Sequence, residues 1–253
     1  MSLPIFTLLE AGNIHAYCTR RGECSPEQPY SGFNVCHYTG DDQKHVSECR
    51  AALSQHFGIP SERMIIPRQT HSINVLKLTS LPVPSERLEG VDAIVTTLTD
   101  VITGVNTADC VPVVLVDPIA GVTGVAHAGW RGAAAGIVEA TVRAMTDLGS
   151  KPSDIIAAMG PSICADCFEV GEEVAVHFDD SCIIRAEGRK PHVSLHGHIV
   201  TALCGCGVKS ENIKPFDPEL CTRCHPDELW SARKSGVKSG RVFTFVINRG
   251  KGL

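Results

Sequence analysis

The sequence predicts an α/β protein of the α+β kind: a single layered α/β domain with mixed sheets flanked by helices. Short runs of β-branched residues bounded by Gly, Asp or Pro indicate strands, and longer stretches of helical periodicity lie between them without strict alternation. The chain has 253 residues, of which 43% are hydrophobic, so it can bury a large core. No linker, repeat or low-complexity tract divides it, and we expect one catalytic domain over residues 1–253.

The N-terminal third is expected to hold one helix among short strands. The helix begins after Asp41 or Asp42, either of which can cap its N-terminus, and runs to about Phe57. Gly58 and Pro60 end it. The strands expected in this part cover residues 14–19, 64–66 and 73–78.

The middle of the chain has the densest strand pattern. Runs rich in Val, Ile and Thr predict strands over residues 93–97, 101–105, 111–116 and 122–127. We expect these four runs to be central strands of one sheet. Apolar residues at helical spacing then predict one helix over 132–148. The remaining expected elements are a strand over 155–159, helices over 172–178 and 194–206, and a closing strand over 241–247.

Composition and charge narrow the functional classes. The formal net charge is -5, which does not favour nucleic acid as a partner. No run approaches 18 apolar residues, and the first residues lack the basic and apolar parts of a secretory signal. We therefore expect a cytoplasmic protein without a membrane partner. In that reducing compartment, the twelve cysteines are expected to be buried residues, metal ligands or nucleophiles rather than disulfides.

Polar residues stand at three predicted strand ends, where scaffolds present catalytic groups. These segments cover residues 68–71, 107–110 and 126–132, and they contain His71, Cys110 and His127. Imidazole and thiolate are ligands that zinc prefers, and three protein ligands leave a fourth position open for catalysis. From spacing alone, each residue can also be an ordinary buried histidine or cysteine.

The segment Gly129–Gly132 lies between a predicted strand and a predicted helix. Backbone N–H groups at a helix N-terminus favour an anion, and Arg131 adds donors for phosphate or carboxylate. A plain tight turn with an exposed arginine explains the same residues equally well.

Seven sequence blocks resemble a known family. Four of them are QTH at 69–71, TADCVPVVLVD at 107–117, VAHAGWRG at 125–132 and GPSI…CFEVG at 160–171. The other blocks contain Arg21, Ser25 and Asn34, the turn Tyr38–Asp42, and the ending Cys221-Thr222 with Trp230–Lys234 and Gly240-Arg241. Taken together, these blocks resemble those of the YfiH family. This is the laccase-domain or "polyphenol oxidase" family, later described as purine nucleoside phosphorylases.

The resemblance implies a metal site and an activity. Members bind one zinc through residues that correspond to His71, Cys110 and His127. Their activity is phosphorolysis of adenosine and inosine to a free base and ribose 1-phosphate, with cleavage of methylthioadenosine and deamination of adenosine also associated. The implied partners are a purine nucleoside and phosphate, and the expected state is a monomer or small homo-oligomer.

The chain departs from the family pattern close to the expected substrate. Ser72 stands where the family has Gly, and Gly22-Glu23 replaces a Gly pair. Leu229-Trp230 and Ala232 stand in place of aromatic residues. These changes bear on substrate preference more than on the metal site.

Further site roles follow from the chemistry. Asp109 can serve as the general base of a deamination. It can equally orient a metal ligand without binding the metal itself. Arg131, with Arg241 or Arg21, is the candidate anchor for phosphate. The candidates for hydrogen bonds to ribose or base are Gln69 and Asn34.

Two other activities compete with this interpretation. Cys110 and His127 can form the nucleophile and base of a metal-free hydrolase or deamidase, which leaves His71 without a role. A copper polyphenol oxidase would need a blue-copper site and a histidine-rich cluster with His-x-His pairs. The one such pair is His196-Gly197-His198, which we expect to be surface histidines on a helix, so copper is disfavoured as the metal.

A second group of cysteines has its own spacing. Cys221, Cys224 and His225 match the CxxCH pattern of covalent haem attachment, but no export signal accompanies it. Cys164 and Cys167 form a second CxxC pair, and two such pairs are typical of a structural zinc site. The long separation between the pairs leaves this second metal site open.

Overall fold

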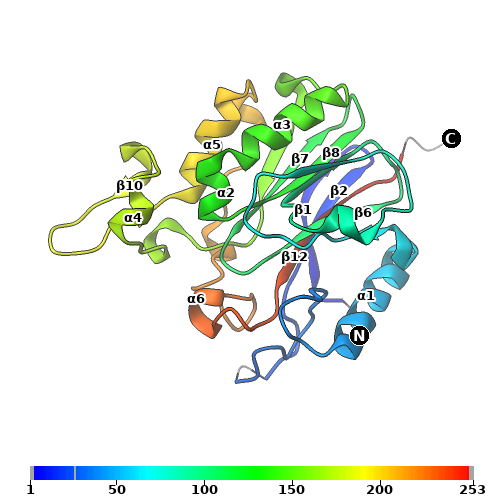
Figure 1. The fold of residues 1–253 in the computed structure, drawn as a ribbon, viewed down its shortest axis with the longest axis horizontal. Helices are drawn as coiled ribbons and strands as arrows, with labels where there is room; N and C mark the ends of the chain where they lie inside the picture. The colour runs from blue at the N-terminus through cyan, green and yellow to red at the C-terminus, as the bar shows by residue number, and fades with distance from the viewer. Residues whose placement is uncertain (1–2, 26, 251–253) are drawn as a thin grey trace.

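The computed structural model describes residues 3–25 and 27–250 (Figure 1). Two five-stranded sheets form the body of the molecule. A third sheet, of two strands, lies in a lobe that extends to the left in Figure 1. Helices flank the sheets. The predicted fold class, mixed α/β with helices around mixed sheets, is therefore confirmed.

The first sheet joins the two ends of the chain. Its strand order is β1-β2-β12-β6-β3, and only the β3–β6 pairing is parallel. Its strands are β1 (Ile5–Ala11), β2 (Ile14–Thr19), β3 (Met64–Ile65), β6 (Ile102–Thr107) and β12 (Val242–Asn248). The sequence did not predict β1, because this edge strand buries few side chains and so carries a weak alternation.

The second sheet carries most of the candidate site. Its strand order is β4-β5-β8-β7-β9. Its strands are β4 (Val75–Leu78), β5 (Ala93–Thr96), β7 (Val111–Asp117), β8 (Val122–Ala128) and β9 (Ile156–Met159). The expectation that four central runs share one sheet is wrong for β6, which pairs with β12 and β3 in the first sheet. Buried strands of either sheet carry the same β-branched pattern, so the sequence does not reveal which sheet each joins.

The two sheets pack face to face between layers of helix. Leu9, Val105, Val114 and Val246 belong to the core between the sheets. A second core joins the outer face of the second sheet to helices α3 and α5, and a third joins the first sheet to α1 (Figure 1). This arrangement buries both faces of the central strands β6, β7 and β8, along which every residue is buried.

The helices agree with the predictions at their capped ends. They are α1 (Gln43–Phe57), α2 (Trp130–Ala135), α3 (Ile137–Asp147), α4 (Glu172–Ala175), α5 (Leu195–Gly205) and α6 (Ala232–Ser235). Asp42 caps α1 by accepting from the Lys44 amide at 2.9 Å, and Gly58 ends it with φ 63°. The single helix expected over 132–148 is two helices, because Gly136 takes a left-handed conformation with φ 95°.

The lobe consists of short elements. The strands β10 (Ile183–Ile184) and β11 (His192–Val193) pair beside α4, which spans four residues rather than the seven expected over 172–178.

The 3₁₀ turns among the described residues are Ser61–Arg63, Ser85–Leu88, Pro152–Asp154, Ala165–Cys167, Asp180–Cys182, Ser210–Asn212 and Pro218–Leu220.

The expectation of two surface histidines at 196 and 198 is wrong for His196. Its imidazole is buried, hydrogen bonds Ser162 Oγ at 2.8 Å and stacks on Phe216. Burial lowers its pKa to about 4, so it is a neutral core residue. His198 is half-buried and contacts the carbonyl of Ala133 through Nε2.

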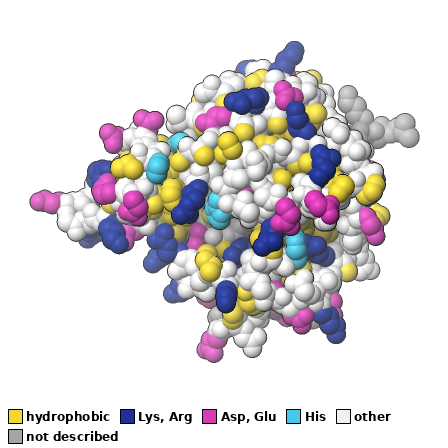
Figure 2. Space-filling view, in the orientation of Figure 1, with side chains coloured by type: hydrophobic (Ala, Val, Ile, Leu, Met, Phe, Trp, Pro, Cys, Tyr) yellow, Lys and Arg dark blue, Asp and Glu magenta, His cyan; other side chains and the backbone are white. Residues whose placement is uncertain are grey.

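Acidic and basic side chains alternate over the face seen in Figure 2, which agrees with the small net charge. Within residues 3–25 and 27–250, none of the helices is long and apolar enough to cross a bilayer.

Candidate metal centre

Three of the predicted residues meet at one edge of the second sheet. His71 lies in the loop before β4, Cys110 precedes β7, and His127 lies on β8. Their ligand atoms all lie within 4.8 Å of one another, and His71 Nε2 is 3.8 Å from Cys110 Sγ. The antiparallel pairing of β7 with β8 brings the start of one strand beside the end of the other, which places Cys110 near His127.

The backbone around this cluster adopts rare conformations. His71 has φ 63° and Asp109 has φ 83°, both in the left-handed region that non-glycine residues seldom enter. A Cβ on Gly129 would lie 2.6 Å from His71 Cδ2 and 2.9 Å from Cys110 Sγ. The site therefore requires a glycine at position 129. Backbone strain such as the positive φ angles of His71 and Asp109 concentrates at functional sites.

Asp92 organises the cluster, and the sequence analysis did not single it out. The fully buried carboxylate accepts from His127 Nδ1 at 2.7 Å. It also accepts from the backbone amides of residues 70, 71 and 72 and from the Ser72 hydroxyl. One side chain thus fixes the ring of His127 and the loop that carries His71.

A signal for Asp92 was present in the sequence. An acidic residue stands immediately before the apolar run Ala93–Thr96, where a buried strand begins. A carboxylate at such a position needs hydrogen-bond donors, and the pairing of β5 with β8 brings His127 to it. The donors come from distant segments, so spacing alone did not reveal them.

The three central groups are electrostatically coupled. Burial opposes ionisation of Cys110, but His127 and His71 outweigh it and lower the pKa of the thiol to about 6. Burial also opposes the charge on His127, but Cys110 and Asp92 raise its pKa to about 9. Burial would raise the pKa of Asp92, yet its bond to His127 lowers it to about 2.

The donor set fits a metal ion such as zinc. In tetrahedral zinc sites, an imidazole nitrogen and a thiolate sulfur lie about 3.6 Å apart, close to the separation of His71 Nε2 and Cys110 Sγ. Asp92 engages Nδ1 of His127 and leaves Nε2 available. His71 is exposed, Cys110 half-buried and His127 buried, so the cluster opens toward solvent on the His71 side.

Asp109 lies beside the cluster with both carboxylate oxygens engaged. Oδ1 accepts from the Thr222 hydroxyl at 2.7 Å, and Oδ2 accepts from the Arg233 amide at 2.6 Å. Of the two roles that the sequence left open, these bonds favour positioning over proton transfer, because no oxygen of Asp109 is without a partner.

Arg131 is exposed, and its guanidinium stacks on Trp130 with 4.3 Å between the guanidinium carbon and the ring centre. It lies in the first turn of α2, a helix of six residues. This leaves its donors facing solvent next to the cluster.

The other four predicted site residues hydrogen bond other groups of the chain, most of them in the backbone. Gln69 exchanges two 2.8 Å hydrogen bonds with the backbone of Asn106. Asn34 donates to Asp41 and accepts from the Arg241 amide. The remaining two residues, Arg21 and Arg241, donate their guanidinium protons to backbone carbonyls. The structure brings Gln69 close to the His71 loop, but it joins Arg21, Asn34 and Arg241 to other segments.

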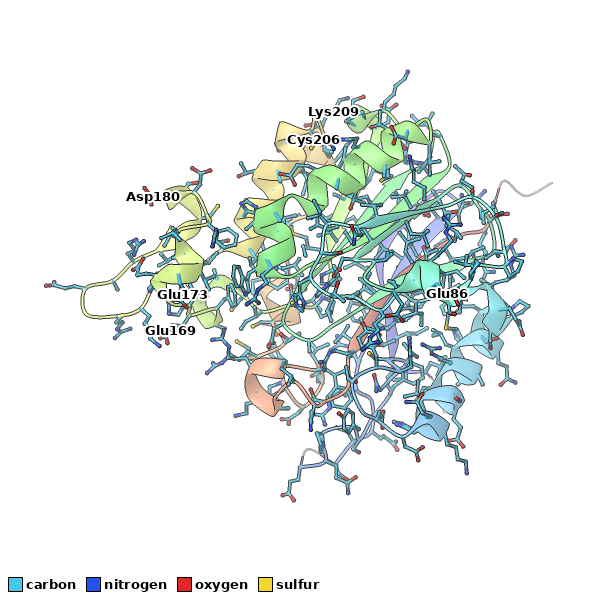
Figure 3. The ribbon with its side chains drawn as sticks, viewed as in Figure 1. Glu86, Glu169, Glu173, Asp180, Cys206 and Lys209 are labelled. Atoms are coloured by element: carbon cyan, nitrogen blue, oxygen red, sulfur yellow. The ribbon has the colours of Figure 1, made fainter. Side chains whose placement is uncertain are left out.

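A cavity of about 320 Å³ lies between the lobe and the segments that carry Trp130 and Arg233. Trp130, Phe168, Lys190 and Arg233 contribute aromatic and basic side chains to its wall. Glu169 and Glu173 also line it, from the lobe at the left of Figure 3. Because Trp130 follows Gly129 and Arg233 binds Asp109, two walls of the cavity are continuous with the metal cluster. A larger cavity of about 860 Å³ is lined by other segments, including Arg21. His71, Cys110 and His127 line neither cavity, and the smaller one is linked to them through Trp130 and Arg233.

The comparisons with known proteins identify the family. Residues 14–249 match the family described as "Multi-copper polyphenol oxidoreductase laccase". The protein named adenosine deaminase RL5, from an unidentified prokaryote, is 41% identical over 249 residues, covering 93% of this chain and 94% of that one. A purine nucleoside phosphorylase of Bacteroides thetaiotaomicron is 35% identical over 247 residues, covering 92% and 90%.

The fold is shared with a solved relative. The crystal structure of the hypothetical protein YfiH from Bacillus licheniformis matches with a TM-score of 0.89 at 25% identity, over 97% of each chain. The fold and the site together define the class of this protein as a mixed α/β protein with a His₂Cys cluster. The chain belongs to the laccase-domain family, the YfiH family whose motifs it resembles.

Proposed function

We propose that this protein is a zinc-dependent purine nucleoside phosphorylase that acts on adenosine, inosine and methylthioadenosine. The observation that carries the proposal is the cluster of His71, Cys110 and His127 beside a cavity of aromatic and basic side chains. Two relatives that match this chain over most of their own length are named an adenosine deaminase and a purine nucleoside phosphorylase.

His71, Cys110 and His127 would hold the zinc ion. When bound, zinc would supply a Lewis acid with one open coordination position. Other parts of the chain hold the three side chains in place for the metal. Asp92 keeps His127 in one tautomer, Gly129 lets the ligands approach, and the buried strands β7 and β8 restrict their movement.

The cavity walls suit a purine nucleoside and phosphate. Phosphorolysis breaks the bond between C1′ of the ribose and N9 of the base, and it forms a bond between C1′ and a phosphate oxygen. The aromatic faces of Trp130 and Phe168 can stack on the base. Arg131, next to Trp130, and Arg233 offer donors to phosphate. Glu169 and Glu173 can accept from ribose hydroxyls.

Deamination of adenosine is the second activity that an observation favours, because RL5 is named an adenosine deaminase. It replaces the amino group at C6 of adenine with oxygen from water and releases ammonia. Asp109 is the predicted base, and its two hydrogen bonds to Thr222 and Arg233 stabilise the carboxylate and so oppose proton uptake.

A metal-free hydrolase also has a specific observation in its favour. Cys110, His127 and Asp92 form a chain of thiol, imidazole and carboxylate, and the low pKa of Cys110 is typical of a nucleophile. However, His71 Nε2 also faces the sulfur, a position that metal ligation explains and acyl transfer does not.

Copper oxidation of phenols remains disfavoured. A multicopper oxidase needs a histidine-rich copper cluster in addition to a His₂Cys site. Among the described residues, the second group of clustered ligand atoms consists of four cysteines, and His196 is buried against Ser162.

The decisive experiment measures metal content and turnover in the same preparation. Inosine is supplied with and without phosphate, and hypoxanthine release is followed for the native chain and for His71→Ala and Cys110→Ala. We expect phosphate-dependent release, and a loss of more than about 100-fold in both variants because each removes a zinc ligand. The matched controls His56→Ala and Cys204→Ser change exposed residues outside the cluster.

The possible results separate the candidates. Ammonia release from adenosine without phosphate would favour deamination over phosphorolysis. Amide hydrolysis by the metal-free chain, lost in Cys110→Ala and retained in His71→Ala, would establish the hydrolase instead. Bound copper with oxidation of a phenol would overturn the zinc assignment.

A further inference from the structure

A second cluster of ligand-type side chains lies outside the His₂Cys site. The sulfur atoms of Cys164, Cys167, Cys221 and Cys224 all lie within 4.8 Å of one another. Cys167 Sγ and Cys224 Sγ are 3.5 Å apart, and all four cysteines are free thiols. Two CxxC pairs separated by more than fifty residues are thus brought together by the fold.

The local backbone holds the two pairs in register. Ser162 and Cys221 form a parallel bridge, in which the Thr222 amide donates to the Ser162 carbonyl at 3.1 Å. The Cys164 amide donates to Cys221 Sγ at 3.3 Å. The Cys167 amide donates to the Cys164 carbonyl at 3.1 Å and closes a tight turn over the first CxxC pair.

We propose that Cys164, Cys167, Cys221 and Cys224 bind a second zinc ion as a structural Cys₄ site. Zinc–sulfur bonds of about 2.3 Å in a tetrahedron place the sulfurs about 3.8 Å apart, which the observed cluster approaches without large rearrangement. Four protein ligands leave no open position, so this zinc has no catalytic role.

Charge around the cluster suits bound thiolates. Zinc with four thiolates carries two negative charges, and the Arg223 guanidinium lies 4.0 Å from Cys167 Sγ. The amide contact to Cys221 Sγ also stabilises a negatively charged sulfur. Cys221 is buried and Cys224 exposed, which places the site at the surface with an entry path from solvent.

The second site would link the lobe to the His₂Cys cluster. The Cys164–Cys167 turn opens the segment that leads to the lobe, and the Cys221–Cys224 turn precedes α6 (Figure 1). Thr222, inside the second CxxC pair, donates to Asp109, the neighbour of Cys110. The zinc would therefore hold one wall of the candidate active site without touching substrate.

The experiment counts zinc in the full chain after expression and purification in reducing buffer. We expect two zinc ions per chain in the native protein. One is expected in the double variant Cys167→Ser/Cys224→Ser and one in the double variant His71→Ala/Cys110→Ala. The matched control Cys204→Ser/Cys206→Ser removes two cysteines from the end of α5 and should keep both ions.

X-ray absorption identifies the ligands even where a cysteine variant fails to fold. In His71→Ala/Cys110→Ala, the remaining zinc should show only sulfur neighbours at about 2.3 Å. Nitrogen neighbours at about 2.0 Å, no zinc at all, or a Cys167–Cys224 disulfide in the purified chain would overturn the proposal. The proposed nucleoside activity is independent of this result, because a Cys₄ zinc can be present in a protein that turns over no nucleoside.

Discussion

The His₂Cys cluster and the Cys₄ cluster rest on different kinds of support. His127 lies on a buried strand, Cys110 directly precedes another, and Asp92 fixes the His71 loop, so the first cluster is held by the sheet. The four cysteines lie on short turns joined by one bridge and a few amide contacts. The first cluster has three ligand-type side chains and faces solvent through His71, whereas the second has four.

This difference predicts which of the two sites would depend on a bound metal for its structure. A scaffold of buried strands organises ligands before metal arrives, and an open coordination position is then compatible with catalysis. Turns with little core of their own gain order from the ion itself. We therefore expect loss of zinc to impair chemistry at the first cluster and local stability at the second.

The largest effect is expected from Gly129→Ala. The new Cβ would lie 2.6 Å from His71 Cδ2 and 2.9 Å from Cys110 Sγ, so the ligands must move apart. We expect zinc affinity at the first cluster to fall by more than about 100-fold while the Cys₄ zinc stays. Metal analysis of the dialysed protein measures this.

The control for that substitution is Gly205→Ala, near the end of α5. No atom lies within 4 Å of a Cβ built there, so both zinc ions should remain. If Gly129→Ala also kept both ions at native affinity, the first cluster would not depend on this close approach.

The next effect is expected from Asp92→Asn. An amide replaces the charged acceptor that holds His127 Nδ1 and three backbone amides, so the ligands lose orientation. We expect zinc affinity at the first cluster to fall about 10- to 100-fold. Competition with a zinc chelator measures the affinity.

Asp117→Asn is a matched comparison, because Asp117 is also buried and accepts from the amides of residues 119 and 120 in a turn. It should cost stability but leave zinc affinity unchanged. Equal zinc affinities in the two variants would show that Asp92 matters only for folding.

The smallest effect is a pH dependence confined to the first cluster. In the metal-free chain the pKa of Cys110 is lowered to about 6, because the two histidines outweigh burial. The thiolate is therefore present above this pH and lost below it. We expect alkylation of Cys110 to be half-maximal near pH 6, to level off about one unit above it and to fall about tenfold per unit well below it, as followed by peptide mass spectrometry.

His127→Gln tests the cause of this shift. Without the imidazolium, the pKa of Cys110 should rise and the alkylation profile should move to higher pH. A profile that does not move would assign the low pKa to another source.

Much of the fold was predictable because local chemistry specifies it. Strand β2 begins and ends at the residues expected, α1 begins after the expected cap Asp42, and α5 lies within the helix expected over 194–206. The errors arise where local pattern and tertiary context differ. Gly136 divides a helix whose apolar spacing is continuous, and β6 joins the first sheet although its residues resemble those of β5.

The predicted site divides in the same way. Motif blocks identified His71, Cys110 and His127, and the fold brings them together. The candidates Arg21, Asn34 and Arg241 also lie in motif blocks, but their side chains hydrogen bond other segments of the chain, and their role toward substrate stays a prediction. Donors and acceptors that stabilise a loop look the same in a sequence as those that bind a substrate.

The sequence by itself determined the fold class, because local periodicity specifies strands and helices. Its motif blocks, through their resemblance to a family, also singled out the three ligand-type residues. Only the tertiary structure decided the partner of His127 and the meeting of the two CxxC pairs. Asp92 reaches His127 through strand pairing, and more than fifty residues separate Cys167 from Cys221. Contacts of this range depend on how the sheets and turns pack, which no short stretch of sequence specifies.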